Sequence, residues 1–239
     1  MKYTILKTGS DGNCAVAEFS DGKKILFDCG KGMYKKFCEA GFKIEEFSGA
    51  FCSHKHADHF GDFHKVDIFF MQNNGLNVLK LPVNHNIECF LYVVSNHESK
   101  EMFIYSTDYS SLPKNTEEII LAIARKCKKD NYKLFAILEL NYCEFLFDKL
   151  PWEMRYGSIS HFSDESFFRL SKKLLAENNE MRIVSTHASQ RKQLRFEAEN
   201  GWNGTICPPD YVKLQIQRRL KTNRVSFGEA RGTVSPYYY

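Results

Sequence analysis

The sequence predicts an α/β fold in a single domain. Short segments rich in β-branched and aromatic residues dominate the first half of the 239-residue chain, and strand-like and helix-like segments alternate in the second half. The composition, with 43% hydrophobic and 26% charged residues, is that of a globular protein with a sizeable core. Because no linker or internal repeat divides the chain, we expect one domain over residues 1–220 and a C-terminal tail over residues 221–239.

The expected strands are enriched in Val, Ile, Phe and Tyr and are separated by turn residues. In chain order they cover residues 3–7, 14–19, 23–28, 49–52, 77–83, 89–95, 101–106, 134–140 and 182–185. Ser20, Asp21 and Gly22 join the second strand to the third, and the glycine suits a tight hairpin turn.

Helix signals separate several of these strands. The expected helices cover residues 34–40, 115–129, 164–176 and 191–200. Gly41 follows the first of them and suits a helix C-terminus because it lacks a Cβ atom. Ser163 precedes the third and can cap it, with Asp164 and Glu165 in the first turn. The segment from Trp152 to Ser160 is expected to be a loop.

Bulk properties narrow the function classes. The formal net charge of +4 is compatible with an anionic substrate but is too small to indicate a strong nucleic-acid binder. No apolar run approaches the length of a membrane span, and the first ten residues lack the apolar core of a signal peptide. The eight cysteines form no C-x-x-C pair, and most lie in apolar runs, so we expect reduced thiols in the core. Together these features predict a cytoplasmic protein.

Residues 52–61, Cys-Ser-His-Lys-His-Ala-Asp-His-Phe-Gly, contain the densest group of metal-binding side chains. His54, His56, Asp58 and His59 lie within six positions. Their alternation favours an extended or tightly turned loop, because residues two apart on a helix face different directions. The preceding apolar residues 49–52 predict a buried strand that ends where the ligands begin. We interpret the stretch as a metal site rather than as a histidine-rich surface loop.

The pattern His-x-His-x-Asp-His resembles the central motif of the metallo-β-lactamase superfamily, and in particular its phosphodiesterase branch. Seven short matches follow the order of the family between residues 1 and 210. They cover residues 10–13, 25–28, 82–85, 106–108, 138–141, 161–163 and 185–187. The resemblance implies a four-layer α/β/β/α sandwich, in which helices cover the outer faces of two packed sheets.

The resemblance also implies two divalent metal ions, with zinc preferred and manganese or iron as alternatives. Residues at matching positions would hold them: His54, His56 and His85 one ion, Asp58, His59 and His187 the other, with Asp108 bridging both. The alternative for His85 is a surface histidine between two strands, and for Asp108 an ordinary turn residue.

The same resemblance assigns catalytic roles to Asp58 and His161. His161 matches a histidine that, in the phosphodiesterase branch, assists the phosphate or protonates the leaving oxygen, and an imidazole can supply that proton near neutral pH. The alternative for His161 is a capping or core histidine. Other polar matches are expected to support the ligands or the substrate: Asn13, Asp28, Glu139 and Asn141. His64 and His97 match nothing and are expected on the surface.

Three reactions compete within the superfamily. We expect hydrolysis of a cyclic mononucleotide by a hydroxide bridging two metal ions, as in phage and bacterial enzymes that counter Pycsar-type defence. The second is nuclease action on RNA or DNA ends, as in tRNA 3′-processing ribonucleases and related exonucleases. The third is hydrolysis of a thioester or lactone. The low net charge favours a small nucleotide, whereas a basic cluster keeps the nuclease open: Arg218, Arg219, Lys221 and Arg224.

The expected partners are therefore a small nucleotide substrate, or RNA or DNA as the alternative, and no membrane. The chain ends with Ser-Pro-Tyr-Tyr-Tyr, whose three tyrosines offer apolar area to a partner. We expect this tail to pack on a second copy of the chain in a homodimer.

Overall fold

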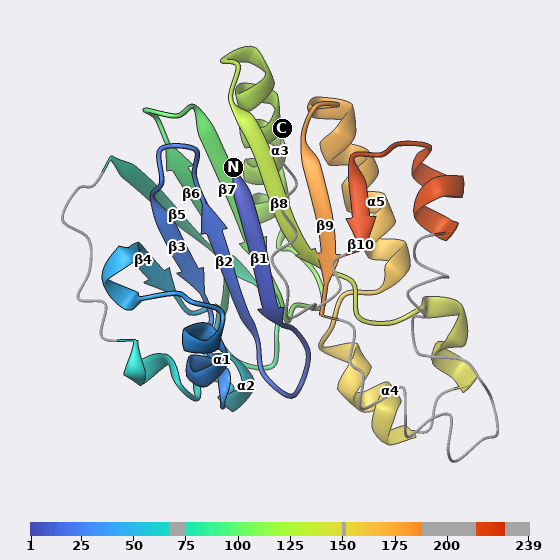
Figure 1. Ribbon diagram of the computed structural model, residues 1–239. Coiled ribbons are helices and arrows are strands. Elements are labelled where there is room, and N and C mark those ends of the chain that lie inside the picture. Colours follow the sequence, from blue (N-terminus) through green and yellow to red (C-terminus); the bar gives the residue numbers. More distant parts are fainter. Residues whose placement is uncertain (67–74, 150–151, 188–213, 228–239) are drawn as a thin grey trace.

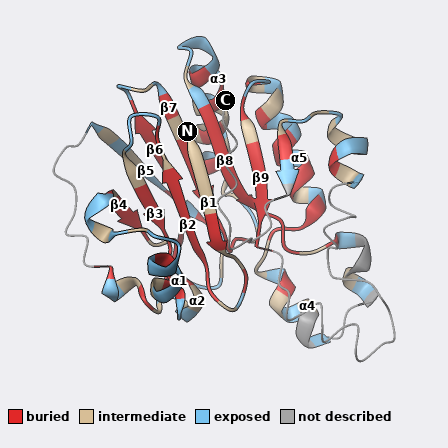
Figure 2. Ribbon diagram, viewed as in Figure 1, coloured by how far each residue is buried: buried red, intermediate tan, exposed pale blue. Residues whose placement is uncertain are grey.

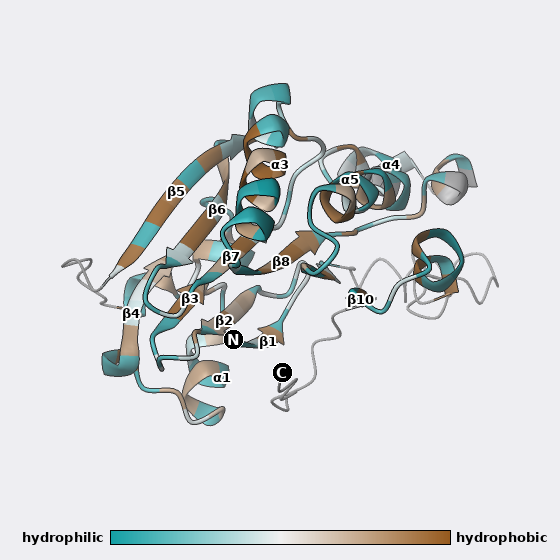
Figure 3. Cartoon of the chain, turned by 90° about the horizontal axis from the view of Figure 1, so that it is seen from above, coloured by the Kyte–Doolittle hydropathy of each residue, from teal (hydrophilic) through white to brown (hydrophobic). Residues whose placement is uncertain are grey.

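The computed structural model describes residues 1–66, 75–149, 152–187 and 214–227, and it confirms the expected fold class. Two β-sheets pack face to face, and helices lie on their outer faces (Figure 1). The view from above shows the order of the layers, with α3 and α5 on one side, the two sheets in the middle and α1 on the other side (Figure 3).

The smaller sheet has four strands in the order β1-β2-β3-β4. They are β1 (Lys2–Lys7), β2 (Cys14–Glu18), β3 (Lys24–Phe27) and β4 (Phe47–Phe51). β1 and β3 are both antiparallel to β2, whereas β3 and β4 are parallel. Gly22 has a φ of 89° in the turn between β2 and β3, which confirms the predicted hairpin and explains the glycine.

The larger sheet has six strands in the order β10-β9-β8-β7-β6-β5. They are β5 (Leu76–Val83), β6 (Cys89–Asn96), β7 (Glu101–Ser106), β8 (Lys133–Glu139), β9 (Arg182–Thr186) and β10 (Val225–Phe227). β6 is antiparallel to both of its neighbours, and β7, β8, β9 and β10 are parallel. The carboxyl ends of β5, β7, β8 and β9 therefore meet at one edge of the sheet.

Five α-helices and several shorter turns complete the described chain. The helices are α1 (Met33–Glu39), α2 (Ala57–Phe60), α3 (Lys114–Lys129), α4 (Trp152–Ile159) and α5 (Asp164–Glu177). The shorter elements are three 3-10 turns (Ile44–Glu46, Phe63–Lys65 and Glu144–Lys149) and a π-helical turn (Ile216–Leu220). Each described helix is too short or too polar to cross a bilayer.

Alternating side chains of the strands fill three separate hydrophobic layers. Ile25 and Phe27 of β3 face the larger sheet, whereas Leu26 between them packs on the side of α1. In β8, Ile137 faces the smaller sheet and Ala136 faces α3 and α5. Because side chains alternate along a strand, a one-residue slip of either strand would exchange these layers.

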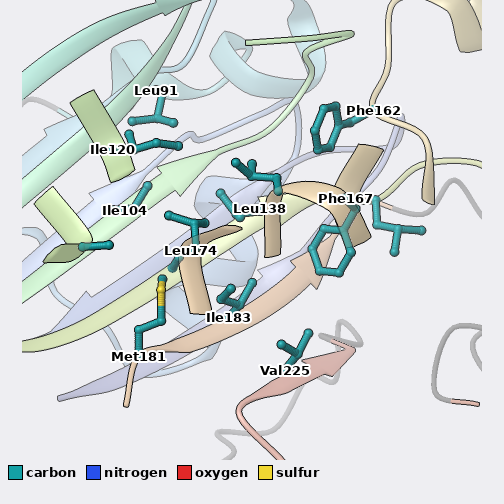
Figure 4. Packing of buried hydrophobic residues seen from close by; sticks show 14 of the residues in the cluster. Leu91, Ile104, Ile120, Leu138, Phe162, Phe167, Leu174, Met181, Ile183 and Val225 are labelled. Atoms are coloured by element: carbon teal, nitrogen blue, oxygen red, sulfur yellow. The ribbon is translucent and has the colours of Figure 1, made fainter. Parts of the chain in front are cut away.

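The buried residues run along the sheets, and the largest layer lies between the larger sheet and its helices (Figures 2 and 4). Ile120 and Ala124 of α3 are fully buried there, and Ile119 and Ile123 pack at its margin, as the helical periodicity predicted. Burying one large apolar side chain stabilises the folded state by about 1.5–3 kcal/mol relative to leaving it in water.

The cysteine prediction holds for the described residues. Their cysteines are free thiols, and most are buried: Cys14, Cys29, Cys89, Cys127 and Cys143.

Two local predictions were wrong. The expected loop from Trp152 to Ser160 is largely helix α4, which was missed because its large apolar residues are exposed rather than arranged on a buried face. Asp58 and His59 lie on the single helical turn α2 rather than in an extended loop. Strand β10, which pairs with β9, lies within the residues expected to form the tail. The expected helix over residues 191–200 and the tyrosines at the C-terminus lie outside the described residues.

Candidate metal centre

The proposed ligands lie where strands end. His85 follows β5 by two residues, Asp108 follows β7 by two, and His187 directly follows β9. These three strands point the same way in the larger sheet, so their carboxyl ends bring the three side chains to one edge. His54 follows β4 of the smaller sheet. Rigid strands thus present loop residues from both sheets to one place.

The structure brings the seven expected ligands together in two clusters that share one residue. Within each cluster, one ligand atom per residue lies within 4.8 Å of all the others. The clusters are His54, His56, His85 and Asp108, and Asp58, His59, Asp108 and His187. This is the grouping expected from the sequence, with Asp108 in both clusters. A third group of the same kind joins Asp108 and His187 to Glu139 and His161.

In the first cluster, imidazole nitrogens face one another at short range. His54 Nε2 lies 2.8 Å from Nδ1 of His56, and His85 Nε2 lies 3.4 Å from the same nitrogen. Oδ2 of Asp108 lies 3.5 Å from His54 Nε2. Burial, followed by the charge of His59, lowers the pKa of His54 to about 3, so this imidazole is neutral and keeps a lone pair for a cation.

In the second cluster, Asp108 lies between two histidines. Its Oδ2 lies 3.2 Å from Nε2 of His59, and its Oδ1 lies 2.7 Å from Nε2 of His187. Asp58 Oδ2 is 3.6 Å from the same nitrogen of His59. Burial alone would raise the pKa of Asp108, but the charges of His187, His59 and His161 hold it well below its usual range.

The donor atoms fit a divalent cation better than they fit one another. Asp108 Oδ1 and His187 Nε2 are buried and only 2.7 Å apart, yet neither atom has a hydrogen bond of acceptable geometry. Buried polar atoms without partners are costly, and a shared cation would satisfy both. Imidazoles and carboxylates in groups of four are also the donors that zinc prefers. The residues present therefore fit a metal pair.

A buried carboxylate and a serine fix the orientation of two histidines. Asp28 Oδ2 accepts a hydrogen bond from Nδ1 of His59 at 2.8 Å, and Ser53 donates its backbone N–H to Asp28 at 2.7 Å. Ser53 Oγ also lies 3.0 Å from Nδ1 of His54. These contacts occupy the Nδ1 atoms, so Nε2 of both rings lies toward Asp108; Nε2 of His59 also lies 2.8 Å from Nδ2 of Asn13. Burial would raise the pKa of Asp28, but the charge of His59 and these hydrogen bonds lower it.

Glu139 and the carbonyl of Ser160 orient the remaining histidines. Glu139, the last residue of β8, accepts hydrogen bonds at Oε1 from Nδ1 of His161 at 2.6 Å and from Nδ1 of His187 at 2.9 Å. Nδ1 of His85 donates to the carbonyl of Ser160 at 3.0 Å. Asn141 Nδ2 donates to the carbonyl of His187 at 2.9 Å. Asn141 and Glu139 therefore position the end of β9.

His161 lies beside both clusters without joining the metal groups expected from the sequence. It precedes Ser163, whose Oγ accepts a hydrogen bond from the backbone of Ser166 and caps α5 as predicted. Its ring centroid lies 5.2 Å from that of His187 and 5.9 Å from that of His85. With 14% of its side chain exposed, it can reach a bound molecule.

The loop with Asn13 braces the ligand turn. The backbone N–H of Asn13 donates to the carbonyl of Asp58 at 2.6 Å, and its Oδ1 accepts a hydrogen bond from the N–H of Gly9 at 2.8 Å. Gly30 approaches the same carbonyl so closely that an added Cβ would lie 1.9 Å from the oxygen of Asp58. Only glycine allows this approach.

Three polar residues of the site have positive φ angles, namely Asp28 (56°), Asp108 (54°) and His187 (73°). Residues other than glycine seldom adopt this left-handed conformation, and each instance costs on the order of 1 kcal/mol. All three follow the ends of strands, where the backbone must turn to aim a side chain at the centre. The shared strain indicates a site that the fold is built to hold.

The sequence did not single out several residues that support the site. One is Ser53, which directly precedes His54 and whose hydroxyl donates a hydrogen bond to Asp28. Another is Tyr105 of β7, whose hydroxyl donates a hydrogen bond to Asp28 Oδ2 at 2.9 Å. The carbonyl of Ser160 has no sequence signature at all. His64 and His97 are exposed, as expected.

Comparison with known proteins agrees with this geometry. Residues 8–101 match the family model described as Anti-Pycsar protein Apyc1. Two relatives with that description come from Bacillus phage 010DV004, 35% identical over 75 residues, and Bacillus phage vB_BveM-Goe7, 35% identical over 74 residues. The matched segments cover 29% and 28% of this chain, and 29% of each relative.

Solved structures extend the likeness over most of the chain. Human tRNase Z, short form, superimposes with a TM-score of 0.57 at 16% identity, covering 81% of this chain and 94% of that one. Yeast PDE1 superimposes with a TM-score of 0.64 at 13% identity, covering 97% of this chain and 98% of that one. The metallo-beta-lactamase fold protein YhfI from Bacillus subtilis superimposes with a TM-score of 0.64 at 13% identity, covering 96% of each chain. The chain therefore has the metallo-β-lactamase fold, and the region with His54, His56, Asp58, His59 and His85 lies within its match to the anti-Pycsar Apyc1 family.

Proposed function

We propose that this protein is a metal-dependent phosphodiesterase that hydrolyses a nucleotide phosphodiester, specifically a cyclic mononucleotide. One observation carries the proposal: Glu139 holds His161 beside two clusters of four metal-ligating side chains, where a proton donor would be needed. A hydrolase that expels an alkoxide needs both an activated water and such a donor. The match to the Apyc1 family over residues 8–101 supports this choice of substrate class.

Two divalent ions, with zinc preferred, would acidify a water molecule and offset charge on the phosphoryl oxygens. The residues of the chain do the remaining work. Asp108 and the histidines hold the ions, and Asp28, Ser53 and Glu139 fix the rings. Asp58, whose side chain is 23% exposed, would hold the proton released by the attacking water.

His161 would complete the reaction on the leaving side. Glu139 accepts a hydrogen bond from Nδ1 of His161, so Nε2 of the ring would be the atom that donates a proton to the departing ester oxygen. In balance, water adds to phosphorus, one P–O ester bond breaks, and the leaving oxygen takes a proton. The product of a cyclic substrate would be a nucleoside monophosphate.

The basic cluster near the C-terminus gives limited support to a polymer substrate. Arg219 forms two hydrogen bonds with Glu165, at 2.6 and 2.7 Å, and its guanidinium lies 4.5 Å above the ring of Phe168. Arg219 is therefore engaged in the fold. Arg218 and Lys221 remain exposed and would be the phosphate contacts if the protein were instead a nuclease, the second candidate.

We also propose that the chain forms a homodimer through its C-terminal segment. Strand β10 ends at Phe227, opposite Ser185 and thus two residues before His187 in the register of β9. The chain continues after this strand to the three tyrosines at its end. A variant shortened to residue 227 should be monomeric and less active; a dimeric variant with full activity would contradict this proposal.

A panel of substrates tests the proposed function. Metal-loaded protein would be offered cyclic AMP, GMP, CMP and UMP, bis(p-nitrophenyl) phosphate, short RNA and DNA, and a thioester. His56→Ala should lower turnover by about 10²-fold or more, because it removes a metal ligand, whereas the exposed His64→Ala should not change it. Opening of cyclic mononucleotides without loss of the polymers is expected. Cleavage of RNA or DNA alone would assign a nuclease, and thioester turnover alone would refute the role of His161.

A further inference from the structure

A second cavity lies at the end of the larger sheet opposite the candidate metal centre. It has a volume of about 280 Å³ and lies where the parallel strands begin. Its lining includes Lys133 and Phe135 of β8, Arg182 of β9 and Arg224 just before β10. The metal centre lies at the other ends of these strands, beyond Glu139 and Thr186 (Figure 1). The cavity is therefore separate from the metal centre.

The strand register places an aromatic ring and two guanidinium groups in one row. Phe135 pairs with Arg182 across β8 and β9, so their side chains share a face of the sheet. Arg224 precedes Val225, which pairs with Ile183, and its carbonyl accepts the N–H of Ile183 at 2.8 Å. This register places Arg224 beside Arg182.

This row faces the side of the smaller sheet, but that sheet does not extend across it. Its edge strand β1 reaches β8, where the ring of Tyr3 packs on Phe135 at 4.8 Å, and β9 and β10 lie beyond β1 (Figure 1). Arg182 and Arg224 are consequently half-buried at the margin of the sandwich.

Two neighbouring guanidinium groups make this cavity electropositive. Burial and the charge of Arg224 lower the pKa of Arg182, as expected for like charges held close together. Lys133 adds a third cation to the lining, and among the described residues Glu180 is the one side-chain carboxylate in it. A dianion relieves such repulsion better than a monoanion. Phosphate monoesters carry about 1.5 to 2 negative charges at neutral pH and match the donor fork of arginine.

We propose that this cavity binds a small organic phosphate of nucleoside-monophosphate type. Arg182 and Arg224 would hold the phosphate, and Tyr132 and Phe135 would contact a planar ring. The volume lies close to the lower end of small-molecule sites, about 300–1,000 Å³, which suits one ring system with one phosphate. The proposal concerns binding alone and does not depend on the reaction at the metal centre.

Isothermal titration calorimetry of the metal-loaded protein tests the site with adenosine 5′-monophosphate, ribose 5-phosphate, inorganic phosphate and adenosine. The variant Arg182→Gln/Arg224→Gln should weaken the adenosine monophosphate site by about 10- to 100-fold, because it removes charge-assisted hydrogen bonds. Arg169→Gln, at an exposed position of α5, is the matched control and should bind as the wild type does. Adenosine should not bind, and ribose 5-phosphate and inorganic phosphate should bind more weakly than the nucleotide.

Phosphates can also bind at the metal centre, so the titrations are repeated with His56→Ala. Binding that persists in His56→Ala and is lost in the double arginine variant supports the proposal. Equal affinity in the wild type and the double arginine variant would overturn it, as would binding abolished by His56→Ala alone. Equal binding of adenosine and its monophosphate would refute the role of the phosphate. Circular dichroism spectra should confirm that the variants are folded.

Discussion

Glu139 holds His161 through a hydrogen bond of 2.6 Å between Oε1 of the carboxylate and Nδ1 of the imidazole. Burial alone would raise the pKa of Glu139, but the charge of His161 and the hydrogen bonds from His161 and His187 lower it. The hydrogen bond fixes the orientation of the His161 ring and leaves its Nε2 available to a bound substrate, as a proton donor to a leaving oxygen requires.

Replacing His161 by alanine should therefore have an effect that depends on the leaving group. Turnover of a cyclic nucleotide should fall by about 10²- to 10⁴-fold, because its alkoxide leaves poorly without a proton. Turnover of bis(p-nitrophenyl) phosphate should fall by less than about tenfold, because nitrophenolate leaves readily unprotonated. Steady-state kinetics with both substrates measure the difference. Equal losses would show that His161 positions the site rather than donating a proton.

Replacing Gly30 by alanine should disturb the metal site through the backbone. The new Cβ would lie 1.9 Å from the carbonyl oxygen of Asp58, so the ligand turn must move. We expect a loss of stability of about 2–4 kcal/mol and weaker metal binding, measured by urea unfolding and metal titration. Gly22→Ala is the control: it carries positive-φ strain in open space and should cost about 1 kcal/mol without changing metal affinity.

The ion pair of Glu101 predicts a pH-dependent contribution to stability. The carboxylate accepts hydrogen bonds from the amino group of Met1 at 2.8 Å and from the N–H of Ser20 at 2.7 Å. Burial would raise the pKa of Glu101, but these partners lower it. Its stabilisation is thus fully present above the unfolded pKa, about 4.3, and is lost as the pH falls through the lower folded value.

Glu101→Gln should lower the free energy of unfolding by about 1.5–3 kcal/mol at pH 7, and the difference from the wild type should shrink below about pH 4. Urea unfolding between pH 7 and pH 3.5 measures it. Glu98→Gln, which removes only an exposed pair with Lys23, should cost less than about 1 kcal/mol. A difference for Glu101→Gln that stays constant with pH would contradict the assignment.

Arg219 provides a test of the nuclease alternative. Its contacts with Glu165 and Phe168 are partly exposed, so Arg219→Ala should cost only about 1 kcal/mol of stability and leave turnover of cyclic nucleotides unchanged. If the basic cluster binds a polymer, Arg218→Gln and Lys221→Gln should instead weaken RNA binding and reduce its salt dependence. Filter binding at two salt concentrations distinguishes the two outcomes.

The sequence predicted most of the strands, and it drew attention to the histidines that the structure brings together, because both leave local signals. Alternating apolar residues mark β3 and β8, and the run from His54 to His59 is dense enough to read directly. Helix α4 escaped because its exposed Trp152 and Tyr156 give no buried periodicity. The role of Ser160 could not be predicted for another reason: its backbone carbonyl orients His85, and that contact depends on tertiary structure alone.

We expect two divalent ions to be held by His54, His56, Asp58, His59, His85, Asp108 and His187. The metal content of protein loaded with zinc and freed of excess metal by gel filtration, measured by inductively coupled plasma mass spectrometry, tests this directly. We predict about two ions per chain for the wild type and for His64→Ala, and less than about one for Asp108→Ala, which removes the residue shared by both clusters. A wild type that retains no metal, or an Asp108→Ala variant that retains as much as the wild type, would contradict the account.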